Sequence, residues 1–502
     1  MENKQYLKRI EKRKLDSFQE YRNSAFAWGI SLILALLILG FGFDISTKKI
    51  NSIAIIVGGI YLVAAIFQYL ITMKIKKEIL QLNDIKKSTR IVGYLLIPFA
   101  ITGNFFMAIA GFTLIKKEKN IEYTLCIYAI LTSFTIMLIS ALNLFKAYVS
   151  NTFMLGMGIL LAITIFYIFT MVMVSKFVKG KVVDKKLLPF AFPLILSVLT
   201  GNVFAFLLGL IIISKLRQKD EEISIEWIDV LRRLFRNYMA VLGMFMVILL
   251  ISLSICSNLT FDYSIAIDNN YETILKSPSL EFPFGTDNYG RCVFTRIVFG
   301  ARISLVVGTI ATLVPVIIGG ILGAISGYYG KKLDNVIMRL LDILYAVPGI
   351  LLAIAIVAAF GANTINLILA LSIGSVPAYA RTVRATVMSI SNNEFVEAAK
   401  ACGAKDFTII LKHIIPNSLA PIIIRATLGI GGAVLSTSSL SYLGLGVEPH
   451  IPEWGNILKI GSNYLETNPY LAIFPGLAII LIVLSFNYFG DGLRDALDPK
   501  LK

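Results

Sequence analysis

The stretch from Ser391 to Pro416 reads SNNEFVEAAKACGAKDFTIILKHIIP, and it is polar between apolar segments long enough to cross a bilayer. Ser391 and Glu394 have the spacing of a capping box, which predicts that a helix starts here. Gly403 stands where a helix commonly ends in a left-handed turn. A second short helix is predicted to begin at Asp406, so the stretch forms a helix–turn–helix outside the lipid.

The second predicted helix has one apolar face. Its apolar residues fall at i, i+3, i+4 and i+7, and they are Phe407, Ile410, Leu411 and Ile414. Pro416 is predicted to end this helix, because the residue before a proline is biased away from helical backbone. We expect the whole element to lie against the cytoplasmic face of a membrane domain.

The order of residues in this stretch resembles the EAA loop of ABC importer permeases. Glu397, Ala398 and Ala399 are followed after three residues by Gly403, and the stretch ends His413-Ile414-Ile415-Pro416 where the family consensus ends Ile-x-Leu-Pro. In that family the loop is the coupling helix that receives the ATPase. The resemblance implies that the coupling residues are Glu397, Ala398, Ala399, Gly403, Asp406 and Pro416.

Composition indicates a multi-pass membrane protein. The 502 residues are 57% hydrophobic, and the mean hydropathy is +0.77. The net charge of +16 comes from Lys and Arg beside apolar spans, as the positive-inside rule predicts, so we expect no nucleic-acid partner. Met1 to Arg22 is interpreted as a cytoplasmic tail ahead of an uncleaved anchor. Two of the four cysteines, Cys256 and Cys292, share the predicted outer side, either bonded or as free thiols.

Residues 1–219 contain a predicted internal repeat, about 25–117 and 123–215. Thr102-Gly103-Asn104 corresponds to Thr200-Gly201-Asn202, Gly111 to Gly209 and Lys117 to Lys215. Apolar runs cover roughly 25–43, 52–72, 91–115, 123–144, 152–178 and 187–214.

Two membrane topologies of this repeat remain open. Six plain spans would place the lysines between 176 and 186 outside, against the charge rule. Four spans with a re-entrant hairpin at each Thr-Gly-Asn turn would keep every basic loop inside. We interpret residues 1–219 as a structural or partner-binding membrane module.

A short polar segment connects the N-terminal half to the second half of the chain. Residues 220–238 are predicted to form an amphipathic helix at the membrane interface, similar to the elbow helix of this transporter class. Residues 239–502 contain predicted spans at 239–256, 302–327, 335–360, 363–389, 419–445 and 470–490. Six spans place both termini and the loop 391–416 on the cytoplasmic side. Gly319, Gly320, Gly323 and Gly327 are predicted to give one face for tight helix packing.

The second half closely resembles the second permease subunit of dipeptide and oligopeptide ABC importers over residues 225–502. The matching runs are Phe282-Pro283-Phe284-Gly285-Thr286-Asp287, then Gly290-Arg291, Gly300-Ala301-Arg302-Ile303-Ser304-Leu305, Pro452-Glu453-Trp454-Gly455 and the tail 487–499. Cys292 departs from the family, which commonly has Asp there. The resemblance implies that Gly285, Thr286, Asp287, Gly290 and Arg291 form an extracellular motif for contact with a binding protein.

This resemblance implies an all-α integral membrane protein, with a six-span type I ABC importer permease core preceded by a duplicated multi-helix membrane module. The expected function is a permease subunit for di- or oligopeptides in a bacterial plasma membrane. The implied partners are a second homologous permease, two cytoplasmic ABC ATPases that bind ATP and Mg²⁺, an extracellular or lipid-anchored solute-binding protein, and membrane lipid. Alternatives are a permease for nickel or another small solute and, in a different class, a secondary transporter or channel.

The sequence does not predict an enzyme. It contains no G-x-x-x-x-G-K-[ST] phosphate loop, no H-E-x-x-H and no G-x-S-x-G. Its two histidines, His413 and His450, fall on opposite predicted sides and form no metal pair. We therefore expect no catalytic residue, no metal and no cofactor bound by this chain.

Overall fold

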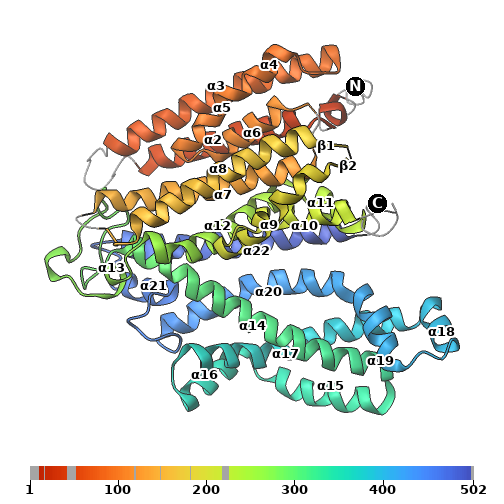
Figure 1. Cartoon of the computed structure of the whole chain (residues 1–502). Helices are drawn as coiled ribbons and strands as arrows, with labels where there is room; N and C mark the ends of the chain where they lie inside the picture. The colour runs from red at the N-terminus through yellow and green to blue at the C-terminus, as the bar shows by residue number, and fades with distance from the viewer. Residues whose placement is uncertain are drawn as a thin grey trace, which may run out of the picture. The chain divides into compact units, whose positions relative to one another are not determined.

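The structure is a computed structural model that describes residues 11–15, 17–41, 52–117, 120–146, 149–180, 182–217 and 225–498 (Figure 1). The chain forms two compact units, Met1–Leu138 with Thr164–Leu187, and Ile139–Ile163 with Leu188–Lys502. Helices dominate both units, as predicted. The one ladder among the described residues joins two-residue strands, β1 (Val178–Lys179) and β2 (Val182–Val183).

The N-terminal half repeats one order of elements: two long helices, then a pair of short arms around a tight turn. In the first repeat these are α2 (Gln19–Phe41), α3 (Ser52–Leu82), α4 (Lys87–Ile91), α5 (Gly93–Leu96), η1 (Ile97–Thr102) and α6 (Phe105–Ile115). In the second they are α7 (Ile121–Ala141), η2 (Leu142–Phe145), α8 (Phe153–Phe177), η3 (Lys185–Leu187), α9 (Leu188–Leu196), η4 (Ser197–Thr200) and α10 (Val203–Arg217).

The turn of each arm pair has the same chemistry. Gly103 and Gly201 have φ of 78° and 72°, which glycine adopts without the Cβ penalty of other residues. The Asn after each glycine caps the next arm: Asn104 accepts from Met107 N at 3.3 Å, and Asn202 accepts from Ala205 N at 3.2 Å.

Small residues also let the two arms of each pair touch. A Cβ on Gly111 would stand 2.6 Å from the carbonyl oxygen of Gly93, and one on Gly209 would stand 2.9 Å from that of Ala191. The helices α2, α3, α7 and α8 are long and apolar enough to cross a membrane, whereas α6 is a shorter apolar helix. This pattern fits the topology with four spans and two hairpins, and the membrane crossing itself stays a prediction.

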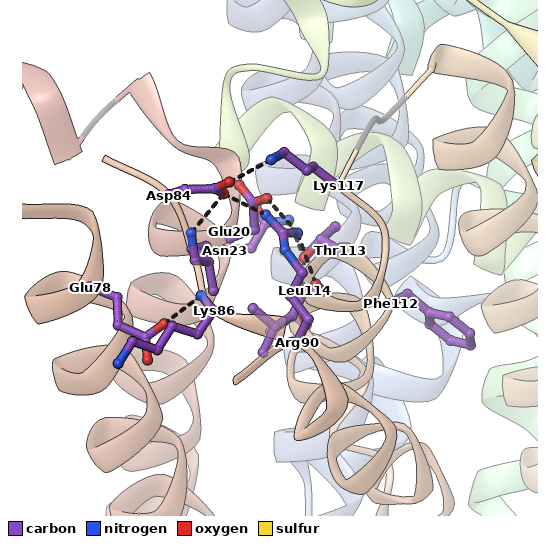
Figure 2. Close-up of polar contacts among 12 residues, drawn as sticks. Glu20, Asn23, Glu78, Asp84, Lys86, Arg90, Phe112, Thr113, Leu114 and Lys117 are labelled. Carbon is purple, nitrogen blue, oxygen red and sulfur yellow. Dashed lines mark hydrogen bonds and ion pairs between the residues drawn. The ribbon is translucent and has the colours of Figure 1, made fainter. Parts of the chain in front are cut away.

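A polar cluster joins the elements of the first repeat at one end (Figure 2). Arg90 is at its centre: Nη1 donates to Glu20 Oε1 at 3.2 Å and to Leu114 O at 3.2 Å. Nη2 donates to Asp84 Oδ1 at 3.4 Å, and Lys117 Nζ pairs with Asp84 Oδ2 at 2.5 Å. These bonds connect α2, the turn before α4 and the end of α6.

The second half contains the predicted permease core. Its helices are α11 (Ile225–Leu234), α12 (Tyr238–Thr260), α13 (Ser264–Ile267), η5 (Tyr271–Thr273), α14 (Val293–Tyr329), α15 (Lys331–Ala346), α16 (Gly349–Phe360), α17 (Thr364–Ser391), α18 (Glu394–Ala401), α19 (Asp406–Ile409), η6 (Ile410–Ile414), α20 (Ile415–Leu443), α21 (Trp454–Ser462) and α22 (Tyr470–Leu497). Among the described residues, 238–260, 293–329, 406–443 and 470–497 are long and apolar enough to span a bilayer.

The predicted span 335–360 is two helices in the structure. α15 and α16 meet at an angle of 80°. Val347 between them is extended, with φ −84° and ψ 124°, and it precedes Pro348. Proline disfavours helical backbone at the residue before it, which accounts for the break. The next predicted span, 363–389, is one helix, α17.

The predicted glycine face of α14 lies where this helix crosses α17 at close range. Cβ atoms on Gly319 and Gly327 would each stand 2.7 Å from a carbonyl oxygen of α17, and Gly323 lies equally close to Ala380. A Cβ on Gly320 would meet nothing within 4 Å, so this glycine is not part of the crossing. Backbone therefore packs directly on backbone along three turns of α14.

Part of the second repeat packs within the same compact unit as the core. A Cβ on Gly201 would stand 2.8 Å from Ser252 Cα of α12. At the C-terminal end of α12, Asn143 Nδ2 donates to Thr260 O at 2.9 Å, and Ser140 Oγ donates to Thr260 Oγ1 at 3.0 Å. The C-terminal part of the first core helix, from Ser252 to Thr260, is thus in contact with residues of the N-terminal half.

Candidate functional site

The stretch 391–416 folds as the predicted helix–turn–helix. α18 is followed by Gly403 with φ of 77°, and α19 begins at Asp406. The turn closes with Gly403 N donating to Lys400 O at 2.9 Å and Ala404 N donating to Ala399 O at 3.1 Å. These bonds satisfy carbonyls at the end of α18, as a left-handed glycine cap does. We call residues 394–414 the docking loop.

The predicted capping box is wrong. Ser391 is the last residue of α17, and its Oγ donates to Met388 O at 3.1 Å. Asn393 stands at the N-cap of α18 without a side-chain cap bond. The start of α18 is displaced because α17 extends to Ser391, which therefore has helical backbone and cannot act as a cap.

Half of the predicted apolar face of the second helix is wrong, and so is its predicted end; Ile410 and Ile414 pack inward as predicted. Ile409 and Ile414 are fully buried, whereas Phe407 and Leu411 are 72% and 46% exposed. Residues 410–414 form a π-helical turn, which shifts the buried face relative to a regular helix. Pro416 does not end the helix, because the helical backbone continues through it from Asp406 to Leu443.

The docking loop is fixed to the membrane helices by its buried side. Val396, Ile409 and Ile414 pack with Ala324 of α14 and with Val383 and Val387 of α17. Tyr328 Oη of α14 donates to Asp406 Oδ1 at 2.7 Å, and Lys400 Nζ lies 5.1 Å from the centre of the Tyr328 ring. The loop therefore moves with α14 and α17 rather than independently of them.

Opposite this buried side, the predicted coupling residues face outward. Glu397, Ala398, Gly403 and Asp406 are exposed, and Ala399 is half-buried. Three large apolar side chains that the sequence analysis did not select for contact, Phe395, Phe407 and Leu411, are exposed beside them. An exposed apolar group with a small-residue surface is suited to a protein contact.

An ion pair joins α15 to α17, the helix that leads into the docking loop. Arg384 Nε and Nη2 each lie 2.5 Å from a carboxylate oxygen of Asp334. Ser326 Oγ of α14 also donates to this carboxylate. Bidentate pairs of this kind fix orientation as well as distance. Three helices are thereby connected beside the docking loop.

The second predicted site, the external motif, is a tightly folded loop. Asp287 Oδ1 accepts from the backbone N–H groups of Tyr289 and Arg291, each at 2.9 Å, and Oδ2 accepts from Arg291 Nε at 2.8 Å. Gly285 and Gly290 have φ of 74° and 75°. A Cβ on Gly285 would stand 2.7 Å from Lys276 O. The motif glycines are therefore required by backbone conformation and close approach.

Most of the motif side chains are buried. Thr286, Asp287 and Arg291 are 0%, 2% and 5% exposed. Thr286 Oγ1 accepts from Lys276 N at 2.8 Å and donates to Thr273 O. These residues maintain the shape of the loop, and contact of the loop with a binding protein stays a prediction.

Glu453 is a buried residue that connects the external loop region to the core. Its carboxylate accepts from Ser304 Oγ of α14 at 3.2 Å, from Ser438 Oγ of α20 at 3.0 Å, and from the backbone N–H groups of Gly455 and Asn456 at 2.8 and 3.1 Å. The sequence analysis placed Glu453 in a family pattern without a role. In the structure Glu453 is the N-cap residue of α21.

The four cysteines are all free, and only Cys402, in the docking loop, is exposed. Among the described residues, no group of three or more His, Cys, Asp or Glu side chains is placed to hold a metal ion. Figure 1 shows the docking loop, α18 and α19, at one end of the core and α13 and α21 at the other. The two candidate sites are thus at opposite ends of the membrane helices.

Comparison with known proteins gives matches to the second half of the chain. Residues 319–502 match the family model described as binding-protein-dependent transport system inner membrane component. Residues 226–278 match the N-terminal TM domain of oligopeptide transport permease C.

Two curated relatives are similar over the same region. A dipeptide transport system permease protein of Alkalihalophilus pseudofirmus is 47% identical over 276 residues, which are 55% of this chain and 90% of the relative. A glutathione transport system permease protein of Pectobacterium atrosepticum is 42% identical over 284 residues, which are 57% of this chain and 94% of the relative. A solved structure of the MetNI methionine ABC transporter is 19% identical with a TM-score of 0.35, over 40% of this chain and 97% of that one. That likeness supports no argument here.

Proposed function

Because the chain belongs to the family of inner-membrane components of binding-protein-dependent transport systems, we propose that it forms part of the pathway for short peptides in an ATP-driven importer. It is a multi-pass membrane transport subunit rather than an enzyme. The relatives named for dipeptide and glutathione transport favour peptides over nickel or another small solute as the cargo.

The observation that carries this proposal is the construction of the docking loop. Its outer side presents Glu397, Ala398 and Gly403 to solvent, while its inner side is packed on α14 and α17. A soluble ATPase that grips the outer side would move both helices, because the buried side cannot slip without exposing apolar groups. Asp406 takes part through its bond to Tyr328, and Pro416 begins the helix that continues from the loop.

The proposed assembly has this chain beside a second, homologous permease. Two cytoplasmic ATPases bind the docking loops and supply the energy of ATP with Mg²⁺, and an extracellular binding protein delivers the peptide to the external loop. Closure of the ATPases would rock α14 and α17 and switch access across the membrane. In this arrangement the chain lies in a bacterial plasma membrane with both termini cytoplasmic, and it binds no cofactor itself.

The N-terminal half is proposed to be an assembly or regulatory module of the same complex. Its second repeat contacts the C-terminal part of α12 through Gly201, Asn143 and Ser140. Residues 1–219 would therefore affect the position of the first core helix. The proposed boundaries are residue 219 for the end of this module and 220–238 for the elbow.

The test is purification of the full chain with its neighbouring subunits. We expect an ATPase to be recovered, and we expect Glu397→Lys or Gly403→Pro to abolish its recovery. Proline cannot adopt the φ of 77° found at Gly403. Lys332→Gln, at an exposed position of α15, is the control and should leave recovery unchanged.

The opposing result is peptide uptake that persists when no ATPase is present. Such uptake would identify a secondary transporter or channel and remove the proposed function. Deletion of residues 1–219 followed by the same uptake assay tests the role of the N-terminal module.

A further inference from the structure

A cavity of about 600 Å³ lies between the external loop and α21. Its wall comes from α13, the motif loop, the connection between α20 and α21, and α21 itself. A volume between roughly 300 and 1,000 Å³ is typical of sites for small organic molecules. The wall combines apolar residues with a few charged and amide side chains, which is the usual composition of such sites.

Two opposite charges on this wall are unpaired. Asp268 and Lys459 both line the cavity, and both are exposed. Within the described ranges, neither side chain has a hydrogen bond or an ion pair. The two charges are therefore available to a ligand and do not neutralise each other directly.

A third charged group on the wall, the guanidinium of Arg291, is buried, and not all of its hydrogen-bond donors have an acceptor. The Arg291 side chain is 5% exposed, and its Nε donates to Asp287 Oδ2 at 2.8 Å. Its Nη2 is buried without a hydrogen-bond partner among the residues that the structure describes. A buried donor without an acceptor is unfavourable, so this nitrogen favours the approach of an oxygen ligand.

Tyr289 covers this guanidinium group. Its ring centre lies 4.5 Å from Arg291 Cζ, and the residue is 40% exposed at the cavity wall. A carboxylate that reaches Nη2 would displace the exposed ring or enter beside it. The buried guanidinium group thus lies behind the exposed Tyr289 ring, at the same wall as Lys459.

We propose that this cavity binds a short zwitterionic peptide, with its ammonium end at Asp268 and its carboxylate end at Lys459 and Arg291. The proposal rests on the proposed import of peptides and adds a recognition site on the permease itself. Besides His450, which lies 3.5 Å from Glu448, the wall carries one acidic and two basic groups. These match the charges of a free peptide, whereas a purely anionic or cationic solute leaves one sign unmatched. The helices that line the site, α13 and α21, lie at the end of the core opposite the docking loop (Figure 1).

The test uses the full chain in complex with its partner permease and ATPases in lipid nanodiscs, without the binding protein. The probe is tritiated Ala-Phe, with N-acetyl-Ala-Phe and Ala-Phe amide as competitors. Each blocked form should bind about tenfold more weakly than the free dipeptide, because it loses one charge-assisted contact.

Two variants test the contacts of the two ends of the dipeptide separately, because each variant removes one charged side chain of the cavity wall. Lys459→Gln should remove the preference for a free carboxylate and keep the preference for a free amine. Asp268→Asn should have the reverse effect. Lys332→Gln removes an exposed lysine outside the cavity and should change neither preference.

Several results would overturn the site. One is a complex that imports peptide with its binding protein but binds no free dipeptide; another is dipeptide binding that neither variant alters. Both leave the proposed function intact. If Lys459→Gln weakens only capture of the binding protein, the cavity is a protein contact and the proposal is wrong. Absence of any ATP-dependent uptake would instead remove the proposed function.

Discussion

The crossing of α14 and α17 gives two adjacent glycines with opposite expected behaviour. Gly319→Ala places a methyl group 2.7 Å from Val376 O and 3.0 Å from Ala380 N, both of them backbone atoms of α17. The first distance is about 0.7 Å shorter than the closest ordinary contact, so the helices must separate. Gly320→Ala, one residue later, meets nothing within 4 Å.

The magnitude follows from two opposing effects. Alanine in a helix interior is more favourable than glycine by roughly 0.5–1 kcal/mol, and this gain applies to both variants. Overpacking costs about 1–3 kcal/mol and applies only at Gly319. The difference in the free energy of unfolding between the two variants isolates the packing effect, because the propensity gain cancels. We expect Gly319→Ala to be about 2 kcal/mol less stable than Gly320→Ala.

The assay is unfolding of the full chain by SDS titration in mixed micelles, followed by tryptophan fluorescence. Gly320→Ala should be as stable as the unmodified chain or slightly more stable. Peptide uptake should fall for Gly319→Ala, because α17 leads directly into the docking loop. Equal stability of the two variants would refute the backbone-to-backbone crossing.

Three further predictions concern the polar contacts. Glu453→Gln should lower the free energy of unfolding by about 2 kcal/mol in the same titration, because one amide oxygen replaces a carboxylate that serves four donors; a loss below about 0.5 kcal/mol would contradict this. Asp334→Asn weakens the pair with Arg384 and should reduce uptake severalfold while ATPase recovery is retained; unchanged uptake would show that the pair does not transmit motion. The pKa of Asp84 is lowered from 3.8 to about 2 by Lys117, by the backbone N–H of Ile85 and by Arg90. The contribution of ionised Asp84 to the stability of the fold is therefore complete above pH 4 and lost as the pH falls toward 2. Lys117→Met should therefore increase pepsin cleavage at pH 4 and have little effect at pH 2, and equal cleavage of both proteins at pH 4 would oppose the assignment.

Local sequence signals predicted the parts of the fold that single residues determine. Gly403 occupies a left-handed turn where the sequence placed one, and Gly103 and Gly201 occupy turns at the two Thr-Gly-Asn segments where one of the two open topologies placed a hairpin. The sequence analysis did not predict the caps that Asn104 and Asn202 form on the arms that follow. The predicted turns depend on residues close in the chain, so turn chemistry was sufficient to find them.

Features that depend on tertiary packing were missed. The buried face of the docking loop is set by Ile409 and Ile414, because a π-helical turn shifts the helix register. No residue type in that segment signals such a turn. The role of Glu453 also required the structure, since its hydroxyl partners, Ser304 and Ser438, come from two other helices. The 80° bend at Pro348 was also missed, because the predicted span 335–360 did not take into account that a proline disfavours helical backbone at the residue before it.

In the proposed importer the docking loop faces the cytoplasm and is covered by an ATPase, and the native Cys402 can test this without any substitution. It is the one exposed cysteine of the chain, beside Gly403 in the loop. A membrane-impermeant maleimide should label Cys402 in inside-out vesicles stripped of the ATPase, and bound ATPase should block the reaction. Labelling of Cys402 in intact cells would place the docking loop on the outside and contradict its proposed contact with a cytoplasmic ATPase.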